Sequence, residues 1–261
     1  MARLSPFSVW SLLRELQRGV GDERPLVVSG PLADQLAKEL GRGADPGWIR
    51  VDGRVEHAAV VVRVLGGAAT EEDERVLRAA NRTGTPAVAV QTAPDVHDVP
   101  YVLATDVVAC LPGSGFPVEE IAAVVAAKLG EDATALASHV PVLRELVVEA
   151  LVERFSRRNA LVGAAVFVPG ADFAVLTLNQ LRLVLRLAVA YGIEVDQQRL
   201  PEIVATIVAG IGFRGLARRL LGAIPIAGWV IKGGVAYVGT RAVGEAAKRY
   251  FQEVSESPTA A

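Results

Sequence analysis

The side chains that most often perform chemistry are few and widely separated in this sequence. Cys110 is the only cysteine, which excludes a disulfide within the chain and a zinc site built from cysteines. His57, His97 and His139 show no spacing typical of metal ligands, and no base stands in an evident position to activate Cys110. We therefore predict no catalytic residue and no metal site, and we expect that the chain is not an enzyme.

The turn after the first predicted strand, Pro25 to Ser29, is where a phosphate-binding loop would stand. Such a loop has the pattern G-x-x-x-x-G-K-[ST], because its glycines expose backbone amides, its lysine carries charge and its hydroxyl binds magnesium. Gly30 matches the opening glycine, but neither the lysine nor the hydroxyl follows, and Asp34 would repel phosphate. The segment therefore predicts no bound nucleotide, and we expect no cofactor.

Paired arginines are the most regular group of charges in the strongly apolar last third of the chain. Residues four apart lie on one face of a helix, so these side chains can form a basic face for an anion or a lipid headgroup. The alternative is a helix cap with internal ion pairs, in which Asp172 and Asn179 would take part. The residues of this basic face are Arg182, Arg186, Arg214, Arg218 and Arg219.

The elements that would position these residues begin with an α/β domain over residues 20–133. Short β-branched runs predict strands, and segments with helical periodicity separate them. Thr70 and Asp73 have the spacing of a capping box, which predicts that a helix begins there. This alternation is typical of a small parallel sheet. Strands are expected at 25–29, 48–51, 57–65, 87–91 and within 101–110, and helices at 32–40, 70–82 and 118–129.

An all-α helical bundle is expected over residues 134–254, with a small-residue junction at 131–138. Gly192 is a natural helix stop, and glycines such as Gly233 and Gly244 favour close contact between helices. The predicted helices of the bundle are 141–158, 172–191, 201–221 and a fourth that ends at Phe251. Outside the two domains we expect an N-terminal amphipathic helix within residues 1–19 and a disordered tail at residues 255–261.

Charge and hydropathy divide the chain in the same way. The part up to His139 carries 13 basic and 19 acidic side chains, whereas the part from Val140 onward carries 14 basic and 10 acidic ones. No basic patch is dense enough to predict a nucleic-acid partner. The longest run without a charged residue, 159–171, has 13 residues, and a membrane span needs about 20. This favours a soluble bundle or a peripheral or re-entrant membrane domain over a true span.

The stretch AAVVVRVLGGAATEEDERVLRAANRTGTPAVAVQT, from Ala58 to Thr92, resembles the middle of an Era-type small GTPase domain. In that domain a strand leads to a T-E-E-D helix start, and a Gly-x-Pro turn leads into the strand before the guanine-reading motif. Cys110 to Ile121, CLPGSGFPVEEI, is similar to the last loop and helix of the same fold. The resemblance covers roughly Pro25 to Leu129 and implies a degenerate P-loop GTPase-like domain.

The same resemblance implies where nucleotide contacts would lie. Gly30 stands at the phosphate loop, and Asp95 stands at the base-reading motif, where its lysine partner is absent. We expect both to be vestigial positions of a scaffold that has no nucleotide site. The alternative is a nucleotide-dependent switch of the GTPase type that uses Gly30 and Asp95 through unusual contacts.

The C-terminal stretch resembles the YcjF-related domain of unknown function found in bacteria, over about Pro141 to Phe251. Such domains often follow Era-type GTPase domains and are often assigned to the inner membrane, while their activity is not established. The features that carry the resemblance are Pro169-Gly170 with Asp172, a helix ending in Tyr191-Gly192, the turn from Ile224 to Trp229, and Thr240-Arg241 with Gly244 before Tyr250-Phe251.

Taken together with these patterns, the two resemblances imply a non-enzymatic bacterial protein on the cytoplasmic side of the inner membrane, in a peripheral or re-entrant position. Its expected partner is the inner membrane or a membrane or helical protein. A soluble assembly or regulatory module in the cytoplasm is the alternative, and a homo-oligomer is a further option.

Overall fold

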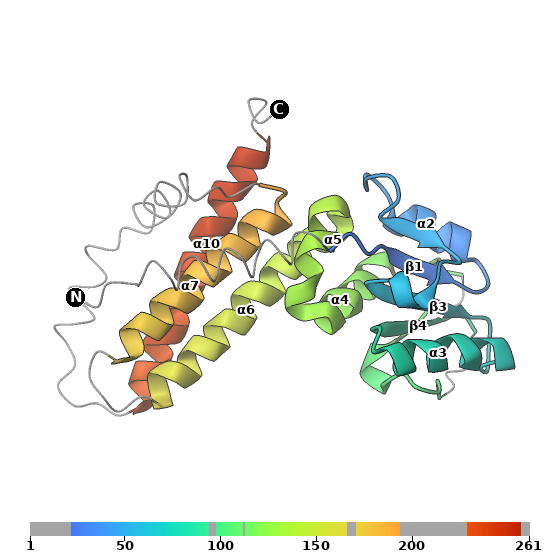
Figure 1. Cartoon of the computed structure of the whole chain (residues 1–261), viewed down its shortest axis with the longest axis horizontal. Coiled ribbons are helices and arrows are strands. Elements are labelled where there is room, and N and C mark those ends of the chain that lie inside the picture. The colour runs from blue at the N-terminus through green and yellow to red at the C-terminus, as the bar shows by residue number, and fades with distance from the viewer. Residues whose placement is uncertain (1–21, 94–97, 112, 166–170, 194–228, 257–261) are drawn as a thin grey trace. The chain divides into compact units, whose positions relative to one another are not determined.

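The computed structural model describes residues 22–93, 98–111, 113–165, 171–193 and 229–256. The chain divides between Val147 and Val148 into two compact units, an α/β unit before this point and a helical unit after it (Figure 1). The sequence places the boundary between residues 133 and 134, so the segment 134–147 packs within the α/β unit. The predicted helix within residues 1–19, Asp95 and the predicted helix at 201–221 lie outside the described residues.

The α/β unit is built on a five-stranded sheet in which every pairing is parallel. The strand order is β2-β1-β3-β4-β5, so the chain adds β2 on one side of β1 and then continues on the other side. This confirms a small parallel α/β fold. The strands are β1 (Leu26–Ser29), β2 (Ile49–Val51), β3 (Val60–Leu65), β4 (Ala87–Gln91) and β5 (Val107–Ala109).

Helices on both faces exclude water from the three central strands. Every residue of β1, β3 and β4 is buried, as expected for a parallel sheet that is covered on both sides. Leu77 and Ala80 of α3 pack against Leu65 and Ala89 of the sheet. The helices are α2 (Ala33–Leu40), α3 (Glu71–Thr83), α4 (Val118–Leu129) and α5 (Ala133–His139), with α2 and α4 in contact with each other.

One strand boundary in this unit needs correction. The strand expected from His57 begins at Val60, because Val55–His57 is a 3-10 turn. The strand expected within 101–110 is present as Val107–Ala109, after another 3-10 turn at Ala104–Asp106. The residues of the junction expected at 131–138 are helical, and Ala133 to Ala137 are all buried. Their small side chains pack closely, and alanine is the best helix former.

Three long helices supply the described part of the helical unit: α6 (Pro141–Ala165), from Val148 onward, α7 (Ala171–Ala190) and α10 (Trp229–Glu256). Gly192 ends α7 as predicted, with a φ of +71°, and the amide of Ile193 donates to the carbonyl of Ala188. The first helix continues past its predicted end to Ala165, and the last continues past Phe251 to Glu256, into the predicted tail.

Two glycines bring α10 close to α6. A Cβ on Gly233 would lie 2.9 Å from the carbonyl oxygen of Ala160, and a Cβ on Gly244 would lie 2.7 Å from a methyl of Val152. This confirms that glycine permits close helix packing at these two positions, whereas Gly234 and Gly239 meet nothing within 4 Å. Within the described ranges, none of the helices combines the length and the apolar character that a membrane crossing requires.

Candidate functional site

The carboxyl ends of the parallel strands meet at one edge of the sheet, where α/β proteins place their sites. Only Gly30, Pro31 and Leu32 connect β1 to α2. Gly30 has a φ of +99°, and a Cβ there would lie 2.2 Å from the carbonyl oxygen of Val64 on β3. The glycine is therefore required by the close approach of the neighbouring strand.

The short β1–α2 turn differs in length from a phosphate loop. Two residues separate Gly30 from Ala33, the first residue of α2, whereas the phosphate-loop pattern has four residues between its glycines. Leu32 occupies the N-cap position with a φ of +60° and no side-chain cap, and Asp34 follows in the first turn of the helix. The first turn of this helix therefore already carries a carboxylate.

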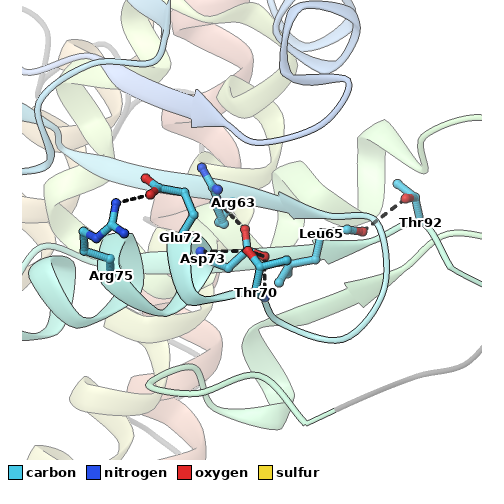
Figure 2. A network of polar contacts seen from close by, with 7 residues as sticks. All are labelled: Arg63, Leu65, Thr70, Glu72, Asp73, Arg75 and Thr92. Atoms are coloured by element: carbon cyan, nitrogen blue, oxygen red, sulfur yellow. Dashed lines mark hydrogen bonds and ion pairs between the residues drawn. The ribbon is translucent and has the colours of Figure 1, made fainter.

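Behind the turn, a buried ion pair joins the sheet to the start of α3 (Figure 2). Arg63 Nε donates to Asp73 Oδ1 over 2.7 Å, and both side chains are less than one tenth exposed. The backbone amide and hydroxyl of Thr70 donate to Asp73 Oδ2 over 2.8 and 2.7 Å, which confirms the predicted capping box. Burial acts to raise the pKa of Asp73, but the hydrogen bonds from Thr70 and Arg63 outweigh it and hold this pKa below its ordinary value.

A small pocket of about 160 Å³ opens at the same edge of the sheet. Thr92 is held in place by two hydrogen bonds, from its amide and its hydroxyl, to the carbonyl of Leu65 on the adjacent strand (Figure 2). The amide of Cys110 donates to the carbonyl of Gln91 over 2.7 Å. The pocket is lined by Leu32, Gln35, Thr92, Cys110, Leu111, Gly113, Gly115 and Phe116.

Cys110 lines this pocket as a buried thiol. Its side chain is 8% exposed, and burial together with the charge of Glu120 raises the pKa of the thiol. A thiol with a raised pKa stays protonated near neutral pH and is a poor nucleophile. The interpretation of Cys110 as a small buried residue agrees with this environment. Within the residues that the structure describes, no group of His, Cys, Asp and Glu side chains could hold a metal ion.

Of the predicted basic face, the structure describes two residues. Arg182 and Arg186 lie four residues apart on α7, each is half-buried, and the Nε atom of each is closed off from solvent. Arg214, Arg218 and Arg219 lie outside the described residues, as does the vestigial position Asp95. The basic face of five arginines therefore stays a prediction.

The helical unit contains a buried polar triad that the sequence analysis missed. The side-chain amide of Asn159 on α6 donates to the hydroxyl of Thr240 on α10, and the amide of Asn179 on α7 donates to Asn159 Oδ1, each over 2.8 Å. All three side chains are buried, with Asn159 and Thr240 fully inaccessible. Asn179 thus forms a hydrogen bond with another side-chain amide. In the sequence analysis we considered it instead as part of a helix cap with internal ion pairs.

A second polar cluster lies toward the surface of the same unit. The hydroxyl of Tyr237 donates to Glu153 over 2.6 Å, and Arg241 bridges Glu153 and Glu149. The hydrogen bond from Tyr237, and after it the contact with Arg157, lowers the pKa of Glu153. These side chains are partly exposed and satisfy one another, so they connect α6 to α10 and resemble a surface ion-pair network, not a reactive centre.

The fold and the site define a two-part protein, in which a small parallel α/β unit without a phosphate-loop pattern precedes a bundle of long helices. The family model described as Domain of unknown function (DUF697) matches residues 129–259, half of the chain, and the chain belongs to this family. The match begins near the boundary that the sequence predicts and before the division at Val147. No curated protein and no solved structure gives a significant match to the chain.

Proposed function

We propose that this chain is a non-enzymatic binding protein. Its α/β unit is a degenerate, Era-type GTPase-like domain that has no nucleotide site, and its helical unit is a YcjF-related domain. The helical unit associates with the inner membrane, on its cytoplasmic side, or with the helices of a protein partner. The family match is compatible with the proposed helical domain, because it covers the helical part of the chain.

The β1–α2 turn is the observation that carries the proposal. A phosphate loop wraps its backbone amides around the phosphates, and it needs four residues between its glycines to do so. Here the Val64 carbonyl oxygen lies so close to Gly30 that no Cβ fits between them. The helix α2 begins three residues after Gly30, at Ala33. Too little backbone remains between β1 and α2 for a phosphate cradle, and Asp34 adds repulsion at the point where the helix dipole would favour an anion.

Isothermal titration of the full chain with GTP, GDP and ATP, each with magnesium, tests this proposal. We expect no heat of binding at micromolar concentrations of nucleotide. Micromolar binding of any of the three would overturn the proposal and favour a nucleotide-dependent switch.

Flotation with liposomes separates the two surroundings proposed for the helical unit. Basic side chains near a bilayer attract anionic lipid by roughly 1 kcal/mol each, and salt screens this attraction. If the membrane is the partner, the bound fraction rises with the anionic-lipid content and falls as salt is added. If no chain floats even at low salt, membrane association is excluded and a helical protein partner remains.

A further inference from the structure

The pocket at the carboxyl edge of the sheet opens onto an apolar surface. Leu32 is 56% exposed and Leu111 is 74% exposed, and the half-buried Phe116 lines the pocket with them. Leu32 also has the left-handed backbone conformation that glycine or asparagine adopts more readily. Neither the turn nor the core of the domain requires a leucine here, so its side chain is available for contact with a partner.

The size of the pocket restricts what can enter it. Pockets for drug-sized ligands measure about 300 to 1,000 Å³, and this one measures about 160 Å³. That volume suits a single aliphatic or methionine side chain and is too small for a nucleotide. Leu32 and Leu111 would flank the inserted side chain, much as near-neutral contacts surround the central anchor of a protein interface.

Carboxylates surround this apolar centre. Helices that follow the strands of a parallel sheet all begin at its carboxyl edge, and the first turns of α2, α3 and α4 carry acids. Within the described part of the chain, four of these acids are exposed and form no ion pair. They are Asp34, Glu71, Glu119 and Glu120.

The negative charge of these acids exceeds the partial positive charge of the helix starts that they accompany. A helix start carries about half a positive charge, whereas the first turn of α4 holds the two carboxylates Glu119 and Glu120. Arg75 and Arg78 of α3 pair with Glu72 and Glu74. The remaining basic residues of the three helices, Lys38, Arg82 and Lys128, lie in the last turns, at the opposite edge of the sheet. Arg63 at the acidic edge is buried in its pair with Asp73. The edge that holds the pocket is therefore negative.

From these features we propose that the carboxyl edge of the sheet docks a basic protein segment that inserts one apolar side chain between Leu32 and Leu111. This inference rests on the proposed function, because it assigns a polypeptide partner to the edge of the sheet where we propose that no nucleotide binds. The acids select lysine and arginine on that partner and repel anionic lipid and nucleic acid. The pocket selects the anchor residue.

Fluorescence anisotropy with a labelled basic amphipathic peptide, LKKLLKLLKKLLKL, tests the proposal on the full chain. We expect saturable binding that weakens as salt is added. Two matched peptides are the controls: one with glutamate in place of every lysine, and one with serine in place of every leucine. Neither should bind. Failure of the basic peptide to bind at low salt would overturn the proposal.

Variants locate the binding surface. Leu111→Ser and Glu119→Lys should each weaken binding of the basic peptide at least tenfold, since each removes one element of the docking surface. Leu103→Ser and Glu56→Lys are the matched controls, because both side chains are exposed before the amino ends of strands, and they should bind as the wild type does. If all four variants bind the basic peptide with equal affinity, the proposal is wrong.

The same preparations distinguish this failure from failure of the proposed function. All four substitutions are at exposed positions, and far-ultraviolet circular dichroism checks that each variant is folded. If neither the peptide nor magnesium with GTP binds the wild type, only the docking proposal fails. If magnesium with GTP binds and the peptide does not, both proposals fail.

Discussion

The α/β unit and the helical unit bury polar side chains in different ways. In the α/β unit the buried pair is charged, and a local capping motif supports it: the Asp73 carboxylate accepts from Thr70, the N-cap of α3, and from Arg63. In the helical unit the buried groups are neutral, and they join three helices that are distant in the sequence, with Asn159 and Thr240 separated by 81 positions.

This difference follows from what aligns each kind of element. Backbone hydrogen bonds set the register of parallel strands, so the central strands can be wholly apolar. Helices satisfy their own backbone and can slide past one another along apolar faces. A buried amide pair penalises such slippage, because each shifted register leaves a polar group without its partner. We therefore infer that the triad Asn159, Asn179 and Thr240 sets the register of the helical unit, while the pair Arg63 and Asp73 anchors one helix start.

The largest expected effect is loss of the charged pair. Asp73→Ala leaves Arg63 buried without a counter-charge and removes the side-chain half of the capping box that Asp73 supplies, which should lower the free energy of unfolding by about 4 kcal/mol. Glu72→Ala is the matched control in the same helix turn. Its exposed pair with Arg75 contributes at most about 0.5 kcal/mol. Urea unfolding measures both, and similar losses in the two variants would contradict the role given to Asp73.

The same carboxylate gives the α/β unit a dependence on pH. The pKa of Asp73 is lower in the folded chain than its ordinary value of 3.8, so its stabilisation is present above that pH. As the pH falls through the folded-state pKa, the carboxylate is protonated and the stabilisation is lost. We expect the wild type to lose more stability than Asp73→Ala between pH 5 and the acid range. Parallel pH curves for the two proteins would rule out this linkage.

A smaller effect is expected where the backbone of the turn meets β3. Gly30→Ala places a methyl against the Val64 carbonyl at a positive φ, and should cost about 3 kcal/mol. Gly84→Ala is the control, since Gly84 also has a positive φ but meets nothing within 4 Å. Strain alone should cost about 1 kcal/mol there. Equal melting temperatures for the two variants would show that β3 does not crowd the turn.

Removal of the central amide tests the helical side of the comparison. Asn159→Leu leaves Asn179 and Thr240 buried without their partner, and should cost about 2 kcal/mol. The exposed Asn81→Leu in α3 should change stability by less than about 0.5 kcal/mol.

A combined variant separates register from stability. With Asn159→Leu, Asn179→Leu and Thr240→Val together, all three members of the triad are apolar, and only the long 3.4 Å hydrogen bond from the partly buried Gln180 to Thr240 loses its acceptor. Stability should therefore return toward that of the wild type. If the triad sets register, the amide resonances of this variant should broaden or double. A single sharp set of resonances would remove the case for a register role.

The smallest effects come from glycines on one helix. Gly244→Ala pushes a methyl into Val152 and should destabilise the helical unit by about 1 kcal/mol. Gly234→Ala enters open space on the same helix and should stabilise it by up to about 1 kcal/mol, because alanine is the better helix former. Thermal melts of the two variants should therefore shift in opposite directions, and shifts of the same sign would contradict the packing of α10 on α6.

Local patterns made much of the α/β unit predictable. Thr70 and Asp73 mark the start of α3 through side chains three residues apart, and the β-branched residues of 87–91 mark β4. The helical structure of residues 131–138 was not evident from the sequence, because alanine and serine occur both in connecting segments and in tightly packed helices. Composition there does not reveal burial, which depends on neighbours elsewhere in the fold.

The sites were less predictable, because they join residues that are far apart in the sequence. Nothing near Asn159 in the sequence indicates that Thr240 accepts its hydrogen bond. In the sequence Leu111 is an ordinary loop residue, and only the fold shows that it lines the same pocket as Leu32. The acids at the helix starts were visible in the sequence as capping residues. Their gathering at one edge follows only from the parallel order of the strands.

The central claim is that the carboxyl edge of the sheet receives a basic polypeptide and not a nucleotide. Hydrogen exchange of the full chain, with and without each ligand, tests it most directly. The peptide LKKLLKLLKKLLKL should slow exchange of the amides from Gly30 to Leu36, at Thr92 and from Cys110 to Phe116, while magnesium with GTP should leave them unchanged. Slower exchange of these amides with magnesium and GTP, or no change with the peptide, would contradict the claim.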